Sequence, residues 1–406
     1  MRIAILTNEY PPHIYGGAGV HVEYLTRELT RLENGGHTVH VLAFGEQSLR
    51  QGNLSVRGVR PDFFLPSQEP RHEKFMDTLA RDLLMAGSLR DVDVIHCHTW
   101  YTHLAGCLAR QLTGAPLVLT THSLEPHRPW KVEQLGTAYH ASTWIERTAY
   151  QNADGVIAVS EAMHADVQTL YGVRPERIRV IHNGIDLEQY QPTPDRAVLA
   201  SHGIDADKPF VLFVGRITRQ KGIVHLVHAI PHLLAGTQVV LCAGAPDTEE
   251  IGREMTEAVE QARRRTSNSI IWIARMLPKQ EIIPLYSQAA VFVCPSVYEP
   301  FGIINLEAMA CGTPVVASAV GGIREVVIPE ETGLLVPIEA RGESDFEPRD
   351  PNRFALDLAA AVNRLLDDPP RRREMGHRCR ARVESHFGWP SIARQTCDFY
   401  RSIGRP

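Results

Sequence analysis

Short apolar runs alternate with longer amphipathic stretches along this chain, and the alternation occurs in two rounds. A short apolar run predicts a buried strand, and apolar residues three or four positions apart predict one face of a helix. The predicted strands of the first round are residues 3–6, 39–44, 92–96, 117–121, 155–159 and 178–181. Those of the second round are residues 210–214, 238–243, 270–273, 291–293 and 315–317. This alternation predicts an α/β protein with two doubly wound parallel sheets.

A proline-punctuated polar stretch, Gln191–Asp195, separates the two rounds and suits a linker between domains. The length of 406 residues also exceeds the roughly 250–300 residues at which a single core stops growing. The sequence therefore predicts one Rossmann-like domain at 1–190 and a second from 191 onward. From residue 350 the pattern predicts three helices and no strand, and such helices need a surface on which to pack.

The composition argues against several classes of protein. The formal net charge of -5 gives no basic surface of the kind that binds nucleic acid or an anionic membrane. The seven cysteines are odd in number and scattered, with no C-x-x-C pair, which predicts reduced thiols rather than disulfides or a zinc site. No run of about 18 apolar residues occurs, and the first apolar run is too short for a signal peptide. We expect a cytoplasmic protein without nucleic-acid or membrane partners.

The first predicted strand leads into a loop with Gly16, Gly17 and Gly19, and this loop opens a predicted helix. Glycines at such a place let backbone N–H groups approach an anion at the positive end of the helix dipole. The loop is incomplete as a dinucleotide fingerprint, because Val22 stands where the third glycine belongs. A phosphate-binding loop and a purely structural turn both stay open.

Two further segments carry candidate binding residues. Arg216 and Lys221 follow the first strand of the second domain, and their planar guanidinium and flexible ammonium suit the two phosphates of a diphosphate. A basic surface loop is the alternative on spacing alone. Glu299 and Glu307 lie at a predicted strand end and in the next helix, so both carboxylates would face one extended ligand and bind sugar hydroxyls. The turns at Gly321–Glu325 and Glu331–Leu335 follow in the order that a nucleotide-sugar site would need.

Several histidines raise the question of a metal. His96 and His98 lie on one face of a predicted strand, but the pattern supplies no third ligand beside them, even with His103 near in sequence. No Asp-x-Asp motif fits a turn beside a strand either. The sequence therefore predicts no metal site and a reaction that depends on electrostatic stabilisation and orientation.

Longer motifs resemble one family over nearly the whole chain. The sequence resembles the retaining glycosyltransferases of the GT-B fold, and among them the group of ADP-glucose-dependent glycogen synthase and α-maltose-1-phosphate synthase. The motifs that carry the resemblance are Glu9–Pro12, Thr121–Lys131, Glu133–Gly136, His182–Asp186, Gly215–Gly222 and Cys294–Glu307. The resemblance implies domains at 1–190 and 191–386 that face across a cleft, and a final helix at 387–406 that crosses back to the first domain.

The same resemblance implies roles for individual residues. Glu299 would bind the 3- and 4-hydroxyls of the donor glucose, His122 its 6-hydroxyl, and Glu307 the ribose of the nucleotide. The expected catalytic residues are His122, Glu299, Arg216 and Lys221. The expected donor-binding set is Gly16, Gly17, Arg216, Lys221, Glu299, Phe301, Gly302, Ile303 and Glu307, and the expected acceptor set is Arg128, Lys131 and Tyr15.

The resemblance also implies the substrates. The expected donor is ADP-glucose, with UDP-glucose as the alternative, and no metal or other cofactor is expected. The expected acceptor is glucose 1-phosphate, giving α-maltose 1-phosphate, or an α-glucan such as glycogen. Arg128 and Lys131 would neutralise a phosphorylated acceptor, although they would also pair with Glu125 and Glu133 on a surface loop. Thr99 replaces the Asp that is frequent in related glycogen synthases, which favours glucose 1-phosphate.

Three alternatives stay open at this point. A dinucleotide-dependent oxidoreductase would share the glycine loop but would not need Arg216, Lys221 and Glu299 together in a second domain. A non-catalytic sugar-nucleotide-binding protein would keep the donor site and lose His122 or Glu299. Another GT-B transferase would use a different sugar nucleotide. The sequence also leaves a homo-oligomer open.

Overall fold

The first round of alternation forms one eight-stranded sheet in the computed structural model, which describes residues 1–14, 16–343 and 345–404. The strand order is β3-β4-β2-β1-β5-β6-β7-β8, and neighbours are parallel except in the antiparallel pair of β3 and β4. The strands are β1 (Arg2–Thr7), β2 (Thr38–Phe44), β3 (Ser48–Gln51), β4 (Leu54–Val59), β5 (Val94–His98), β6 (Leu117–Thr121), β7 (Gly155–Ala158) and β8 (Ile178–Val180).

The pair of β3 and β4 was not predicted. β3 is exposed along its length, and β4 buries only Val56 and Val59, so neither strand has the apolar run that marks a buried strand. β3 is the edge strand of the sheet, and β4 lies between it and β2. The central strands, by contrast, are buried on both faces, as the predicted parallel sheet requires.

Helices cover this sheet, and some of them have clear start and stop signals. α6, for example, starts where the Ser160 hydroxyl accepts a hydrogen bond from the Met163 N–H, and it stops at Gly172, whose φ of 66° is left-handed. The helices between the strands are α1 (Gly17–Arg31), α2 (Glu73–Ser88), α3 (His103–Thr113), α4 (Val132–Leu135), α5 (Ala138–Asn152) and α6 (Glu161–Tyr171).

The second round forms a six-stranded parallel sheet with the order β11-β10-β9-β12-β13-β14. The sequence did not predict β14, which is only four residues long and starts at a glycine. The strands are β9 (Phe210–Arg216), β10 (Gln238–Gly244), β11 (Ser269–Ile273), β12 (Val291–Cys294), β13 (Val315–Ser318) and β14 (Gly333–Val336).

Several helices of this half start at side-chain caps. Thr248, Asp350 and Asp368 each accept a hydrogen bond from a backbone N–H of the first helical turn that follows them. The helices are α7 (Arg196–Ser201), α8 (Ile223–Ala229), α9 (Glu249–Arg265), α10 (Lys279–Gln288), α11 (Ile303–Ala310), α12 (Ile323–Val326), α13 (Pro351–Leu366) and α14 (Pro369–His386).

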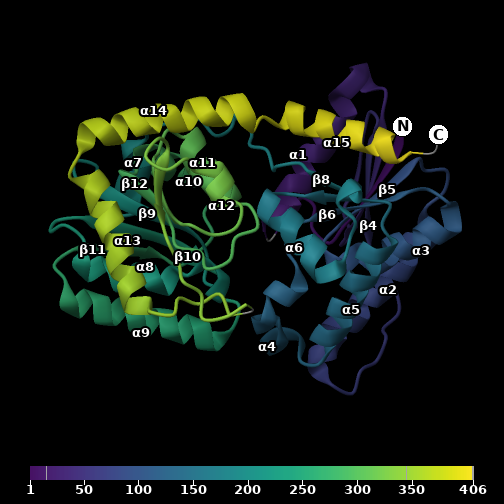
Figure 1. Ribbon diagram of the computed structural model, residues 1–406, viewed down its shortest axis with the longest axis horizontal. Coiled ribbons are helices and arrows are strands. Elements are labelled where there is room, and N and C mark those ends of the chain that lie inside the picture. The colour runs from purple at the N-terminus through teal and green to yellow at the C-terminus, as the bar shows by residue number, and fades with distance from the viewer. Residues whose placement is uncertain (15, 344, 405–406) are drawn as a thin grey trace. The chain divides into compact units, whose positions relative to one another are not determined.

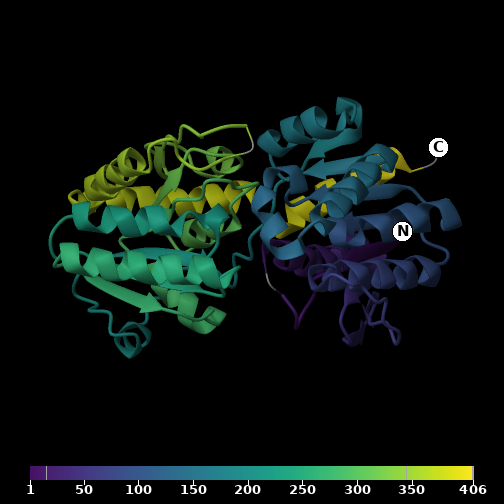
Figure 2. The ribbon, with the colours of Figure 1, turned by 90° about the horizontal axis from the view of Figure 1, so that it is seen from below.

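The chain divides into two compact units, and the first is discontinuous. It contains Met1–Gly184 together with Trp389–Pro406, whereas the second contains Ile185–Gly388. These limits lie a few residues from the predicted ones at 190 and 386. The C-terminal helix α15 (Trp389–Ile403) lies beside α1 in the first unit, as both views show in yellow and purple (Figures 1 and 2). The predicted return of the last helix to the first domain is confirmed.

The amphipathic face of α15 explains its position. Trp389, Ile392 and Tyr400 are buried in the same apolar core as strands β1 and β2 and helix α1. The Trp389 ring stacks on Tyr24 with ring centroids 5.6 Å apart. The Tyr400 hydroxyl lies 2.6 Å from Nδ1 of His96 in β5. Apolar burial therefore holds α15 on the sheet, and polar contacts fix its register.

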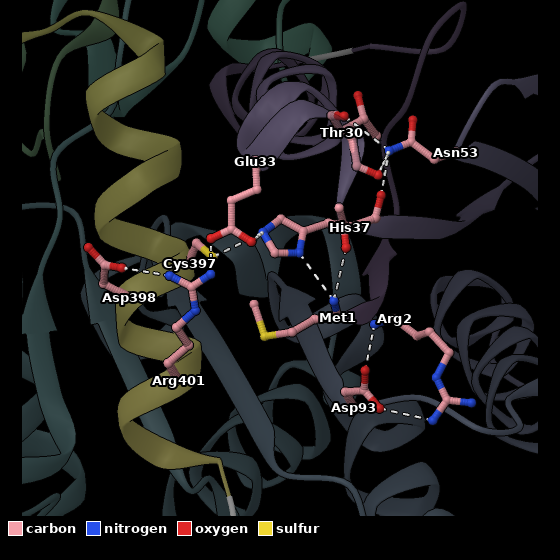
Figure 3. A network of polar contacts seen from close by, with 12 residues as sticks. Met1, Arg2, Thr30, Glu33, His37, Asn53, Asp93, Cys397, Asp398 and Arg401 are labelled. Atoms are coloured by element: carbon pink, nitrogen blue, oxygen red, sulfur yellow. Dashed lines mark hydrogen bonds and ion pairs between the residues drawn. The ribbon is translucent and has the colours of Figure 1, made fainter.

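A polar network beside the N-terminus adds to this attachment (Figure 3). Nε2 of His37 lies 3.3 Å from Sγ of Cys397, and Nδ1 of His37 lies 3.2 Å from the Met1 amino group. Arg401 of α15 forms an ion pair with Glu33. The contacts join three stretches that are remote in sequence: the first residue, the turn after α1 and the final helix.

Candidate active site

The best-defined candidate site of the second unit lies beyond the carboxyl ends of the neighbouring strands β9, β12 and β13. Backbone hydrogen bonds join the three loops there: the Val297 N–H donates to Gln220 O at 3.0 Å, and the Gly322 N–H donates to Glu299 O at 3.1 Å. A Cβ at Gly222, whose φ is 58°, would lie 2.1 Å from the carbonyl oxygen of Pro295. This is the edge at which open parallel sheets bind ligands.

Lys221 and Glu299 form a direct ion pair at this edge. Nζ of Lys221 lies 2.6 Å from Oε2 of Glu299, and the Ser296 hydroxyl donates to the same oxygen at 3.2 Å. Burial lowers the pKa of Lys221, but the carboxylate of Glu299 and, to a smaller extent, Cys294 raise it, and the net effect is a raised pKa. Among the residues described, none bonds Oε1 of Glu299, which leaves that oxygen to accept hydrogen bonds from a ligand.

Arg216 lies at the last position of β9, as predicted, and its Nη1 donates to Asp247 at 2.8 Å. The side chain keeps 38% of its exposure, so the rest of the guanidinium can bind an anion. Sequence reasoning missed Asp247 because it follows a different strand, β10. The structure thus brings both predicted cations to one edge of the sheet, each with a carboxylate partner.

Two tyrosines hold Glu307. The Tyr190 hydroxyl donates to Oε1 at 3.0 Å, and the Tyr286 hydroxyl donates to Oε2 at 2.8 Å. Burial raises the pKa of Glu307, and the two hydroxyl bonds oppose that rise. Neither tyrosine was predicted, since each belongs to another element and nothing in the local sequence marks it. A ligand hydroxyl at Glu307 would donate a hydrogen bond to a carboxylate lone pair that the two tyrosines do not occupy.

The residues between the two glutamates have mainly structural contacts. The Phe301 side chain is buried and its ring lies 6.0 Å from that of Phe387. Gly302 has a φ of 101°, which is left-handed, and precedes α11, whose first residue is Ile303. Phe301 therefore offers a ligand only its backbone, whereas the N–H groups at the start of α11 point out of the helix.

The candidate site of the first unit centres on three histidines, of which His21 and His98 are buried and His122 is partly buried. Nδ1 of His98, at the end of β5, lies 2.9 Å from Nε2 of His122, which follows β6. His21 of α1 lies beside them and contacts Oδ1 of Asn183 through Nδ1 at 2.6 Å. Burial lowers the pKa of His21 to about 4 and lowers the pKa values of His98 and His122 well below the usual range. All three imidazoles are neutral at pH 7.

His21 also corrects one sequence argument. The strand pattern supplied no third ligand, yet one nitrogen each from His21, His98 and His122 lies within 4.8 Å of the others. Two nitrogens bound to tetrahedral zinc would be roughly 3.3 Å apart, given metal–nitrogen bonds of about 2.0–2.1 Å. The 2.9 Å between His98 and His122 suits a shared proton instead. That no metal is needed stays a prediction.

The glycine loop already binds an anion of the chain itself. The Gly16 N–H donates to Oε2 of Glu9 at 2.8 Å, at the start of α1, where a phosphate oxygen was predicted. Gly17 is the first residue of α1. A phosphate that binds the Gly16 amide would have to displace Glu9. Tyr15, the third predicted acceptor residue, lies outside the described residues.

The predicted acceptor cations are less exposed than a surface loop implies. Nη1 of Arg128 lies 3.5 Å from Oε1 of Glu125 and 3.2 Å from the Ser123 hydroxyl, and Lys131 is 9% exposed. Arg128 pairs with Glu125, as the alternative to phosphate binding predicts. The pair lies inside the fold, however, and not on a surface loop. Burial and then the nearby Glu125 raise the pKa of Glu146, so this pair of acids carries less than its full charge.

Among the described residues, no helix is long and apolar enough to cross a membrane.

Residues 15–189 match the family described as Glycosyltransferase Family 4, and residues 195–344 match Glycosyl transferases group 1. An α-maltose-1-phosphate synthase of Mycolicibacterium smegmatis is 48% identical over 408 residues, which cover 99% of this chain and 100% of the relative. A glycogen synthase of Mycobacterium tuberculosis is 30% identical over 432 residues, covering 100% of this chain and 95% of the relative.

Solved structures share the fold of the whole chain. Sucrose-phosphate synthase from Thermosynechococcus elongatus superposes with a TM-score of 0.77 at 28% identity, covering 99% of this chain and 98% of that structure. The catalytic domain of Starch Synthase IV from Arabidopsis thaliana gives a TM-score of 0.73 at 20% identity, with 99% of both chains covered. The chain belongs to the GT-B glycosyltransferases, in the group that contains α-maltose-1-phosphate synthase and glycogen synthase.

Proposed function

We propose that this hexosyltransferase moves glucose from ADP-glucose to glucose 1-phosphate and so makes α-maltose 1-phosphate. The observation that carries the proposal is the paired Lys221 and Glu299 at the ligand-binding edge of the second sheet. The ammonium of Lys221 suits the leaving diphosphate, and the carboxylate of Glu299 suits the sugar hydroxyls. The 48% identity to an enzyme named α-maltose-1-phosphate synthase supports the choice of substrates.

In this proposal the second unit binds the donor. Arg216 and Lys221 stabilise the charge that grows on the diphosphate as the glycosidic bond breaks. Glu299 holds the glucose through Oε1, and Glu307 binds the ribose. The acceptor hydroxyl attacks the anomeric carbon from the side of the leaving group, and the departing phosphate oxygen takes the hydroxyl proton, so the product keeps the α configuration. His122 in the first unit binds the 6-hydroxyl of the donor glucose.

Arg128 and Lys131 are assigned to the phosphate of the acceptor. Glu125 offsets part of the charge of Arg128. The 30% identity to a glycogen synthase of Mycobacterium tuberculosis supports glycogen as a second acceptor. The seven cysteines are all free thiols, which supports the cytoplasm as the place of action.

A comparison of acceptors tests the proposal. ADP-glucose and UDP-glucose are each supplied with glucose 1-phosphate or with glycogen, and kcat/KM is measured for the wild type, Lys131→Ala and Arg128→Ala/Lys131→Ala. We expect preference for ADP-glucose and glucose 1-phosphate, with a loss in the variants that is larger for glucose 1-phosphate than for glycogen. Efficient extension of glycogen with no use of glucose 1-phosphate would identify a glycogen synthase instead.

Removal of metal ions is a second test. Because cationic side chains are assigned to the diphosphate, excess EDTA should leave the rate of ADP release essentially unchanged, while Arg216→Ala should lower kcat by about 10²-fold or more. Re-addition of magnesium or manganese after EDTA serves as the control. A rate that collapses with EDTA and returns with one of these ions would refute the metal-free assignment.

A further inference from the structure

The contact between His98 and His122 holds a single proton. Nδ1 of His98 and Nε2 of His122 are 2.9 Å apart, which is hydrogen-bond distance, so one nitrogen donates and the other accepts. Both rings are neutral, and each therefore carries one N–H. The direction of this one bond fixes the tautomer of both rings.

The other nitrogen of His98 decides the direction. Nε2 of His98 is buried and has no hydrogen-bond partner within the described part of the chain. If His122 donated, the proton of His98 would lie on Nε2 and would be a buried donor without an acceptor, which is rare in folded proteins. If His98 donates, Nε2 is a bare lone pair, which is easier to leave unpaired. The proton therefore belongs on Nδ1 of His98.

The tautomer of His98 determines the tautomer of His122. Its Nε2 accepts the bond from His98, so its own proton must lie on Nδ1. His122 is only partly buried, and its Nδ1 is not among the buried nitrogens that lack a partner. The ring thus presents an N–H, and not a lone pair, on the side that a ligand can reach.

We propose that His98 is a positioning residue that fixes His122 as the Nδ1–H tautomer, so that His122 donates a hydrogen bond to the 6-hydroxyl of the donor glucose. This inference rests on the donor assignment given above. It adds a residue of β5 that does not itself contact the substrate. Without His98, His122 returns to the Nε2–H form that a neutral histidine side chain prefers in water, and its outer nitrogen loses the proton.

Variants at position 98 separate positioning from a general structural role. His98→Leu removes the donor, whereas His98→Asn places an amide N–H near the former Nδ1. We expect kcat/KM with ADP-glucose to fall about tenfold to a hundredfold in His98→Leu and to recover partly in His98→Asn. His103→Leu, at another buried histidine of the first unit, controls for loss of a buried imidazole and should keep its activity. Thermal unfolding confirms that each variant is folded.

A donor without the 6-hydroxyl provides the decisive comparison. With ADP-6-deoxyglucose the wild type is already slower, and His98→Leu should cause little further loss, because the bond that His98 supports has no acceptor. An equal loss with both donors would overturn the positioning role and indicate a structural one. Failure of the wild type to use ADP-glucose at all would refute the donor assignment, and the tautomer would still be decided as follows.

Nuclear magnetic resonance of histidine-labelled enzyme reads the tautomer directly. The nitrogen shifts of His122, assigned by their loss in His122→Asn, should report a protonated Nδ1 in the free wild type and a protonated Nε2 in His98→Leu. A protonated Nε2 of His122 in the wild type would overturn the inference whatever the substrates prove to be.

Discussion

At the scale of single residues, Glu299 divides its two oxygens between two tasks. Oε2 accepts from Lys221 and Ser296, and Oε1 is the oxygen that the proposal assigns to the donor glucose. Glu299→Gln keeps the shape but replaces a charged acceptor with a neutral one and leaves Lys221 without its counter-charge. We expect kcat/KM to fall by about 10²-fold or more, since charge-assisted hydrogen bonds in a dry site are worth about 1.5–3 kcal/mol each. Steady-state kinetics of a folded variant with near-normal kcat/KM would contradict the assignment.

Asp82 of α2 provides a prediction about stability. Both carboxyl oxygens are buried, and burial, which the nearby Ala105 backbone N–H opposes only in part, raises the pKa of Asp82 well above its ordinary value. The folded state therefore keeps a proton that the unfolded state loses. The free energy of unfolding should fall as pH rises above about 4, by up to about 1.4 kcal/mol per pH unit within the titration range.

Asp82→Asn carries no titrating group at this position, so its stability relative to the wild type should improve from pH 5 to pH 8. Urea unfolding at both values measures this difference. Identical pH dependence in the two proteins would show that Asp82 is not protonated in the native state.

Residue types at strand ends predicted Arg216, Lys221 and Glu299 correctly as neighbours of one sheet edge, because parallel strands bring their carboxyl ends together. Tyr190, Asp247 and His21 could not be predicted in the same way. Each reaches the candidate site of its own unit from a part of the chain whose packing depends on the fold of that unit. The roles in substrate binding assigned to these residues stay predictions.

At the scale of elements, the loop after β9 depends on a glycine. Gly222 and Gly203 both have left-handed φ values, 58° and 71°, but an added Cβ would meet Pro295 O at Gly222 and open space at Gly203. Alanine at either site costs about 1 kcal/mol of backbone strain. Only Gly222→Ala should also displace Lys221 and lower kcat/KM, by about tenfold or more. Kinetics and thermal unfolding of both variants test this, and equal activity would show that the loop tolerates the shift.

Elements with strong apolar runs were predicted well, and those without them were missed. β5 and β6 lie near their predicted positions because they are buried on both faces, whereas β3 lies at an exposed edge and offers no apolar signal. β14 is too short to be distinguished from a turn by pattern alone. The position of a strand in the sheet and its length, rather than its composition, therefore limit how well the sequence pattern predicts it.

At the scale of the whole molecule, the first unit depends on a helix from the far end of the chain. Trp389 is 2% exposed, stacks on Tyr24 and packs against Gly184. Trp389→Ala should lower the stability of the first unit by about 3–5 kcal/mol, as expected for a buried tryptophan. Arg394→Ala, at an exposed position of the same helix, should change stability by less than about 0.5 kcal/mol. Calorimetry would contradict the prediction if both variants unfolded like the wild type.

The discontinuity of the first unit has a consequence for the way the protein is made. The face of its sheet that α15 covers is complete only when α15 has been synthesised, and the whole second unit, Ile185–Gly388, is translated before it. At about 5–20 residues per second, the nascent first unit waits roughly 10–40 s on the ribosome with an uncovered apolar face. During that interval the growing chain is a substrate for chaperones, and the second unit, which is continuous in sequence, can finish folding before the first.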